Sequence, residues 1–263
     1  MAVKLLFLGN SNDVNPDIPE EQRSPARTAA LLAEAIGEPV EVAARTVWAD
    51  AALPGLVEKW MLRYQPDIVL FKVNWYWYGY ESVPAKVERV LGRAGALPAK
   101  AGRRAAETPA IGHRRLFHQL RRLAYRFIGG DAPFSEQHVI DVSTAVIRKI
   151  LAHEDVVLVV KGTATYHLDG EPAVADYRAR FVRKRDRVEG TLAALCARLG
   201  VRWADNRHTG GLEHAGLEDG DGIHHDVGVQ ELMAGHHVRD LAAAWKAAGR
   251  QAVGTREGPL AAR

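Results

Sequence analysis

A glycine, an asparagine and a serine, Gly9, Asn10 and Ser11, end the first apolar run of the chain. A glycine permits a tight turn off a strand, so the serine would stand at the start of the next helix. There, backbone N–H groups and the positive end of the helix dipole would face a developing oxyanion. The segment predicts Ser11 as a nucleophile whose own N–H is an oxyanion donor. The same residues also suit a plain turn or a phosphate cradle.

A second segment near the other end of the chain could supply a general base. It reads Asp221-Gly222-Ile223-His224-His225. A serine nucleophile needs a base of near-neutral pKa, held in one tautomer by a carboxylate. We predict His224 as the base and Asp221 as its orienting partner, with His225 as the alternative base. The competing interpretation is a solvated surface loop.

A metal site is the other alternative for this region, because several His and Asp residues gather between positions 208 and 237. The region lacks H-E-x-x-H and any other paired-ligand pattern. We therefore predict no metal and no cofactor.

The elements that must position these residues follow a repeated strand–helix alternation. Strands are predicted at 3–8, 40–44, 67–73, 155–160 and 201–204, and helices at 24–36, 53–64, 83–91, 135–152, 173–199 and 227–248. Ser24 is predicted as the N-cap of the first helix, with Pro25 as its first residue. The pattern indicates an α/β fold, a flavodoxin-like three-layer α/β/α sandwich with a five-stranded parallel sheet. Ligands of such sheets bind beyond the carboxyl ends of the strands, here near residues 9–13 and 74–78.

One segment interrupts the alternation. Residues 93–134 begin with a Gly/Ala/Pro-rich stretch and continue into a basic amphipathic pattern. We predict a helical insertion after the third strand–helix unit, within a single domain spanning 1–249 and followed by a flexible tail at 250–263. The basic helix either packs on the body, covers the site as a lid, or contacts an anionic membrane or another polyanion through residues 113–127.

Taken together, the two segments resemble the blocks of the SGNH (GDSL-like) hydrolase family. LLFLGNSND resembles the first block and DGIHH the last, a D-x-x-H that supplies both triad partners. PDIVLFKVN resembles the third block, which ends in an oxyanion asparagine. The resemblance spans residues 3 to about 245, with 93–134 as an insertion. It implies a flavodoxin-like sandwich and cofactor-free hydrolysis or transfer of acyl groups.

The resemblance also assigns the oxyanion site. It identifies Asn74 as the side-chain donor, and Trp48 or Ala49 as the backbone donor, although the expected glycine is absent there. Asn10 replaces the usual aspartate and can still hydrogen-bond the turn. The aromatic residues that follow Asn74 either cover the end of the sheet or form a wall for an apolar acyl group; Trp75 and Tyr76 are their first members.

Composition fits an ordinary soluble protein of 263 residues, 47% hydrophobic and 25% charged, with a formal net charge of +3. That small surplus does not indicate nucleic-acid binding. Cys196 is the only cysteine, so no intramolecular disulfide can form, and its apolar surroundings predict a core position. Without a secretory or membrane-spanning stretch, we expect a cytoplasmic protein of unassigned oligomeric state.

The predicted function is therefore a serine esterase that cleaves a small or medium carboxylic ester through an acyl-enzyme on Ser11. Two rivals remain open. One is an acyltransferase on the same scaffold. The other is a non-catalytic flavodoxin-like module that binds an anionic ligand.

Overall fold

The structure is a computed structural model. It describes residues 2–15, 17–79, 83–92, 130–163, 175–206 and 226–250, together with positions 94, 97, 123 and 127. All statements below refer to these residues.

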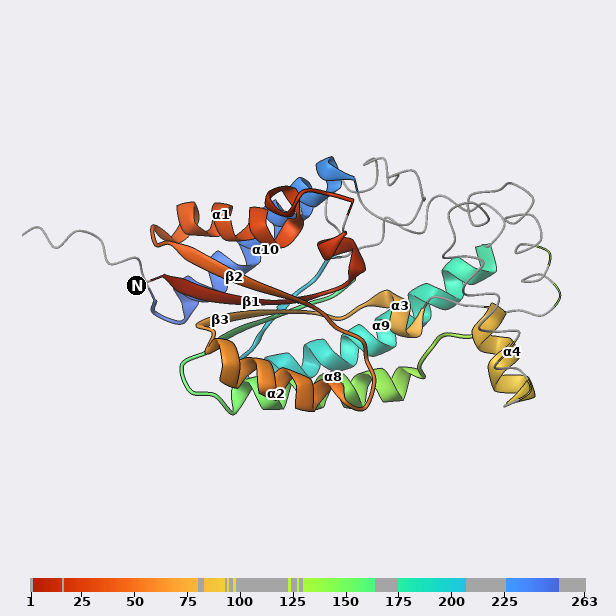
Figure 1. The fold of residues 1–263 in the computed structure, drawn as a ribbon. Coiled ribbons are helices and arrows are strands. Elements are labelled where there is room, and N and C mark those ends of the chain that lie inside the picture. Colours follow the sequence, from red (N-terminus) through yellow and green to blue (C-terminus); the bar gives the residue numbers. More distant parts are fainter. Residues whose placement is uncertain are drawn as a thin grey trace, which may run out of the picture.

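A parallel sheet forms the middle layer (Figure 1). Its strands are β1 (Val3–Gly9), β2 (Val40–Thr46), β3 (Ile68–Lys72), β4 (Val157–Lys161) and β5 (Arg202–Ala204), in the order β2-β1-β3-β4-β5. The three middle strands are almost continuously buried, as expected where helices cover both faces of a sheet. The strand order places the carboxyl end of β1 between those of β2 and β3. This is the position that the Ser11 segment requires.

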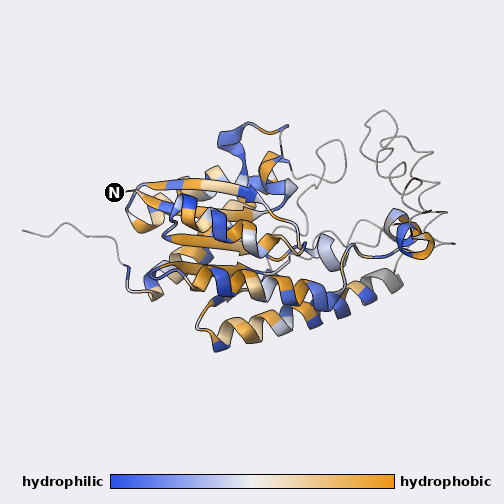
Figure 2. Cartoon of the chain, turned by 60° about the horizontal axis from the view of Figure 1, so that its bottom comes forward, coloured by the Kyte–Doolittle hydropathy of each residue, from blue (hydrophilic) through white to orange (hydrophobic). Residues whose placement is uncertain are grey.

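Helices cover both faces of the sheet (Figure 1). One face carries α1 (Ser24–Ile36) and α10 (Val227–Ala247), and the other carries α2 (Leu53–Tyr64), α8 (Glu136–Leu151) and α9 (Ala175–Arg198). The smaller α4 (Val83–Leu91) lies beyond the body of the sheet. Figure 2 shows the apolar residues concentrated along the strands and on the inward sides of the helices. The predicted three-layer α/β/α fold is confirmed.

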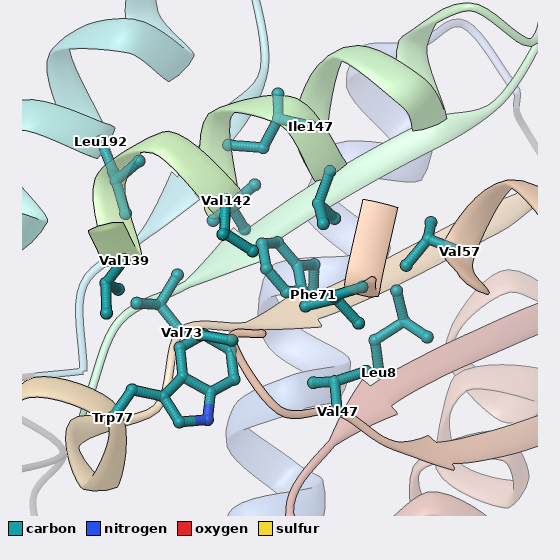
Figure 3. Packing of buried hydrophobic residues seen from close by; sticks show 14 of the residues in the cluster. Leu8, Val47, Val57, Phe71, Val73, Trp77, Val139, Val142, Ile147 and Leu192 are labelled. Atoms are coloured by element: carbon teal, nitrogen blue, oxygen red, sulfur yellow. The ribbon is translucent and has the colours of Figure 1, made fainter. Parts of the chain in front are cut away.

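The larger core lies between the sheet and the α2–α8–α9 layer. Leu8, Phe71 and Val73 point into it from the strands and meet Val139 and Ile147 of α8 (Figure 3). Cys196 is fully buried in the same cluster, and burial raises the pKa of its thiol to about 11. The predicted core role of this cysteine is confirmed.

The start of the first helix differs from the prediction. Arg23 is the N-cap residue and Ser24 is already helical, with Pro25 as the second residue. The Ser24 side chain does not cap because it is buried against α10, where its Oγ lies 3.2 Å from Nδ1 of His237. A tertiary contact has replaced the local one.

Short elements at the carboxyl edge of the sheet were not predicted. Residues Ser11–Val14 form a single 3₁₀ turn, η1; Glu20–Gln22 form a second, η2; and Trp75–Tyr78 form the one-turn helix α3. Ser11 therefore begins a single 3₁₀ turn and not the long helix expected after the first strand.

The predicted basic insertion at 93–134 and the tail at 250–263 lie almost entirely outside the described residues. The same is true of the proposed membrane contact at 113–127, and the domain limits remain predictions. No helix among the described residues is both long and apolar enough to cross a bilayer.

Candidate active site

Ser11 is exposed at the carboxyl end of β1, while Asn12 and Asp13, which follow it, are buried. The turn is closed by reciprocal hydrogen bonds. The backbone N–H of Asn10 donates to Oδ2 of Asp13 at 2.8 Å, and Oδ1 of Asn10 accepts from the N–H of Asn12 at 2.9 Å. These bonds fix the backbone on both sides of Ser11, so its hydroxyl is presented to solvent from a rigid turn.

Gly9 is required by the close approach of this turn to the strand. A Cβ on Gly9 would lie 2.3 Å from Oδ2 of Asp13 and 2.7 Å from the ring of Phe7. Neither neighbour is free to move, because Asp13 closes the turn and Phe7 is in the core. Only glycine therefore fits before Asn10, which agrees with the turn predicted from the sequence.

A buried ion pair holds the turn to the neighbouring strand. Nζ of Lys72, at the end of β3, donates to Oδ1 of Asp13 at 2.5 Å, and both side chains are almost fully buried. Removing one member of a buried pair leaves an uncompensated charge and costs about 3–5 kcal/mol. Lys72 was not predicted as part of the site, although a lysine at the end of an apolar strand indicates a buried counter-charge.

Asn10 and Asn74 lie side by side across β1 and β3. Nδ2 of Asn10 donates to Oδ1 of Asn74 at 2.8 Å, and Asn74 is buried two residues after the end of β3. Because Oδ1 of Asn74 is occupied, its Nδ2 is turned away from Asn10. The structure thus places the predicted oxyanion asparagine next to the serine turn, 64 residues away in sequence.

The loop after β2 lies on the other side of the serine turn. Gly9 pairs with Thr46 in the sheet, and the N–H of Val47 donates to the carbonyl of Gly9 at 2.9 Å. Trp48 is 47% exposed, whereas Ala49 is fully buried. The N–H groups of these two residues have no acceptor among the described residues, while the N–H of Asp50 is taken by the carbonyl of Trp48.

His138 of α8 fixes the same loop. Its Nε2 lies 2.7 Å from the carbonyl oxygen of Ala49, so the ring donates there in the Nε2–H tautomer. Phe134 stacks on the His138 ring with centroids 4.9 Å apart, and Trp48 packs on Phe134 at 5.5 Å. This contact could not be predicted from the sequence, because His138 and Ala49 are 89 residues apart and come together only when the helices pack on the sheet.

Gln230 connects the serine turn to two helices. It is fully buried in the first turn of α10, where its Nε2 donates to the carbonyl of Asn12 at 2.5 Å. Its Oε1 accepts from the backbone N–H of Ser24, the first residue of α1, at 2.8 Å. The beginning of α10 is thereby fixed beside the turn that carries Ser11.

The predicted acid–base residues Asp221 and His224, and the alternative base His225, lie outside the described residues, which resume at Asp226. Asp226 is the N-cap of α10, and its Oδ1 accepts from the N–H of Val229 at 2.8 Å. No cluster of three potential metal ligands occurs among the described residues.

The aromatic segment after Asn74 packs mainly inward. Trp75 is buried against Phe181 of α9, with ring centroids 5.8 Å apart, and stacks on the half-buried Tyr76 at 4.4 Å. Trp77 lies in the core below Val73 (Figure 3). Trp75 therefore covers the end of the sheet, and Trp48 is the more exposed aromatic ring at this edge.

Two buried ionisable groups at the carboxyl end of β4 have strongly shifted pKa values. Desolvation lowers the pKa of Lys161 to about 8, although Asp240 lies 2.6 Å from its Nζ. Desolvation also raises the pKa of Glu189, in α9, to about 7. Glu189 lies on the apolar face of its helix. A charged residue at such a position is the pattern in the sequence that could have identified it.

Comparison by sequence finds no matching protein-family model and no matching curated protein. Comparison of structures does find similar folds. Est24, a carbohydrate acetylesterase from Sinorhizobium meliloti, has a TM-score of 0.50 and 13% identity, covering 92% of this chain and 99% of its own.

Two further structures agree with it. The psychrotrophic esterase EstA from Pseudoalteromonas sp. has a TM-score of 0.51 and 11% identity, covering 93% of this chain and 98% of its own. The family 3 carbohydrate esterase from Clostridium thermocellum has a TM-score of 0.51 and 10% identity, covering 94% of this chain and 98% of its own. At these identities the likeness concerns the fold alone, and it agrees with the three-layer α/β/α architecture predicted from the sequence.

Proposed function

We propose that this chain, which has the fold of SGNH-type hydrolases, is a serine esterase that cleaves a carboxylic ester through an acyl-enzyme on Ser11. The observation that carries the proposal is the hydrogen bond between Asn10 and Asn74 beside the exposed serine. This bond joins the turn that carries Ser11 to Asn74, whose Nδ2 is the side-chain oxyanion donor in this proposal. An acyl-transfer site requires this combination of a nucleophile and a donor for the oxyanion.

The serine turn suits an oxyanion better than a phosphate. The N–H groups of Asn10, Asn12 and Asp13 all have acceptors within the turn. That of Ser11 has none among the described residues. A phosphate cradle needs several converging N–H groups, whereas an oxyanion hole collects single donors from different segments. We assign these donors as the Ser11 N–H, the N–H of Trp48 or Ala49, and Nδ2 of Asn74.

The general base in this proposal is His224, oriented by Asp221. Support comes from Gln230, which fixes the first turns of α10 beside the serine turn. In the sequence, His224 lies two residues before Asp226, the N-cap of α10. In the mechanism, His224 takes the proton of the Ser11 hydroxyl as it attacks the ester carbonyl. It then returns that proton to the leaving alcohol, and water resolves the acyl-enzyme with His224 again as the base.

The experiment measures hydrolysis of p-nitrophenyl acetate, butyrate and octanoate by the wild type and by S11A, H224A, H225A and D221A. A fluorophosphonate probe with peptide mass mapping identifies the labelled serine. We expect labelling at Ser11, and activity lost in S11A and H224A but retained in H225A. Removing a triad member typically lowers kcat by roughly 10⁴-fold or more.

S143A is the matched control. Ser143 is fully buried in α8, and its Oγ has no partner among the described residues, so the change should leave activity intact. Activity that survives S11A, or a label on another serine, would overturn the proposal. Because two structural neighbours are carbohydrate esterases, acetylated sugars are the next substrates to test. Transfer of the acyl group to an added alcohol or sugar, in preference to water, would identify an acyltransferase instead.

A further inference from the structure

Thr163 and Glu189 form a buried polar link that ends at the peptide preceding Asn74. Oγ1 of Thr163, just after β4, donates to the carbonyl of Val73 at 3.1 Å. The N–H of Thr163 donates to Oε1 of Glu189 in α9 at 2.7 Å. All these bonds are buried, and none belongs to the regular hydrogen bonding of the sheet.

The carbonyl that Thr163 holds belongs to the same planar peptide as the N–H of Asn74. On the other side of Asn74, its carbonyl accepts from the N–H of Trp77 at 3.2 Å. The Asn74 backbone is therefore fixed before and after the residue, and its side chain is fixed by Asn10. Among these contacts, that of Thr163 comes from the segment just after β4, next to the sheet bond in which the N–H of Val73 donates to the carbonyl of Lys161 at 2.9 Å.

Glu189 in turn is held from several directions. The hydroxyl of Tyr78, in α3, donates to the same Oε1 at 3.2 Å. The other oxygen of Glu189, Oε2, lies against Gly162, where an added Cβ would come within 2.7 Å of it. Oε2 has no hydrogen-bond partner among the described residues. Burial favours the neutral form of this carboxyl group and raises its pKa to about 7, and in either form Oε1 remains an acceptor for the Thr163 N–H.

We propose that Thr163 is a positioning residue for Asn74, and that Glu189 holds Thr163 in place for that purpose. Neither residue touches the reacting atoms. Their effect is to aim Nδ2 of Asn74 at the developing oxyanion. The inference rests on the proposed esterase function for its catalytic consequence, whereas its structural content is independent of catalysis.

T163V tests the link most directly, because it exchanges the hydroxyl for a methyl group of similar size. We expect kcat for p-nitrophenyl acetate to fall by roughly 10- to 100-fold with KM little changed, since a displaced donor weakens transition-state binding selectively. T163S keeps the hydroxyl and should recover most of that loss. The control is T191V, which makes the same exchange at an exposed threonine of α9 whose Oγ1 bonds to the carbonyl of Arg187.

Glu189 is tested by a pair of variants. E189Q preserves a carbonyl acceptor at Oε1 and should keep kcat near that of the wild type. E189L removes the acceptor and should resemble T163V. If E189L does not fold, T163V and T163S still decide the proposal.

A readout independent of activity separates this inference from the proposed function. The chain has five asparagines, so selective ¹⁵N-asparagine labelling yields a simple amide spectrum. We expect T163V to shift the backbone and side-chain signals of Asn74, while T163S and T191V leave them in place. Unmoved Asn74 signals in folded T163V, or a loss confined to KM, would overturn the positioning role. If T163V shifts the Asn74 signals but S11A remains fully active, the positioning role of Thr163 holds and the proposed esterase function is rejected.

Discussion

Nδ2 of Asn10 donates to Oδ1 of Asn74 across two adjacent strands at 2.8 Å. The bond links the turn that presents Ser11 to the residue that would complete the oxyanion site. Asn10 also closes its own turn by accepting from the N–H of Asn12. The side chain of Asn10 thus fixes both the backbone next to Ser11 and the orientation of the Asn74 side-chain amide.

Asn10→Ala should lower kcat by roughly 10²–10³-fold, because Asn74 loses its orienting partner and one oxyanion donor is misplaced. The free energy of unfolding should fall by only about 1–3 kcal/mol, as expected for broken hydrogen bonds. Steady-state kinetics with p-nitrophenyl acetate and urea unfolding measure both quantities. A variant that is destabilised but fully active would show that Asn10 serves the turn alone.

Gln230→Met should reduce both stability and kcat. Methionine preserves the length of the side chain but leaves the carbonyl of Asn12 and the N–H of Ser24 without their buried partners. We expect a loss of about 1–3 kcal/mol per unsatisfied group in the free energy of unfolding. The control is Gln137→Met, where an exposed glutamine bonds to Asp141 within α8. Equal effects of the two changes would rule out a specific role for Gln230.

Trp48→Ala should weaken the binding of esters with long or aromatic acyl groups more than that of acetate. The ring is 47% exposed beside the serine turn and is backed by Phe134, so it offers a rigid apolar surface. KM should rise several-fold for the octanoate ester with little change for the acetate, and Trp48→Phe should recover part of the difference. Leu62→Ala removes a side chain that is 65% exposed on α2 and serves as the control. A uniform change across the ester series would contradict substrate contact by Trp48.

Glu189 should make stability depend on pH. Burial raises its pKa from the ordinary 4.5 to about 7, despite the opposing effects of the Thr163 N–H, Arg185 and Tyr78, while Asp205 adds to the rise. Between these two values the folded state binds more protons than the unfolded state. The contribution of neutral Glu189 to the free energy of unfolding is therefore fully present below pH 4.5 and is lost as the pH rises to about 7.

Urea unfolding of the wild type and of Glu189→Gln at several pH values between 4 and 8 measures this contribution. The variant should be less sensitive to pH than the wild type across that interval, because glutamine does not ionise. Parallel curves for the two proteins would show that Glu189 ionises normally.

The sequence by itself determined the alternation of strands and helices and the turn at Gly9. These features depend on local patterns, namely continuous apolar runs for buried strands, helical periodicity, and a glycine where a side chain would collide with Asp13. The serine motif is local as well, so Ser11 could be predicted as the nucleophile without coordinates. Asn74 could be predicted as the oxyanion asparagine only through the family resemblance, and both roles stay predictions.

Only the tertiary structure decided which side chains support the site. Gln230 is 218 residues from Asn12, and His138 is 89 residues from Ala49. No sequence pattern pairs them, because such contacts depend on the order of the strands and on the rotamers that packing allows. For the same reason, Ser24 is not the predicted cap but makes a buried contact with His237. A local sequence motif is enough to predict the candidate nucleophile, whereas the residues that surround Ser11 are determined by the packing of elements distant in the sequence.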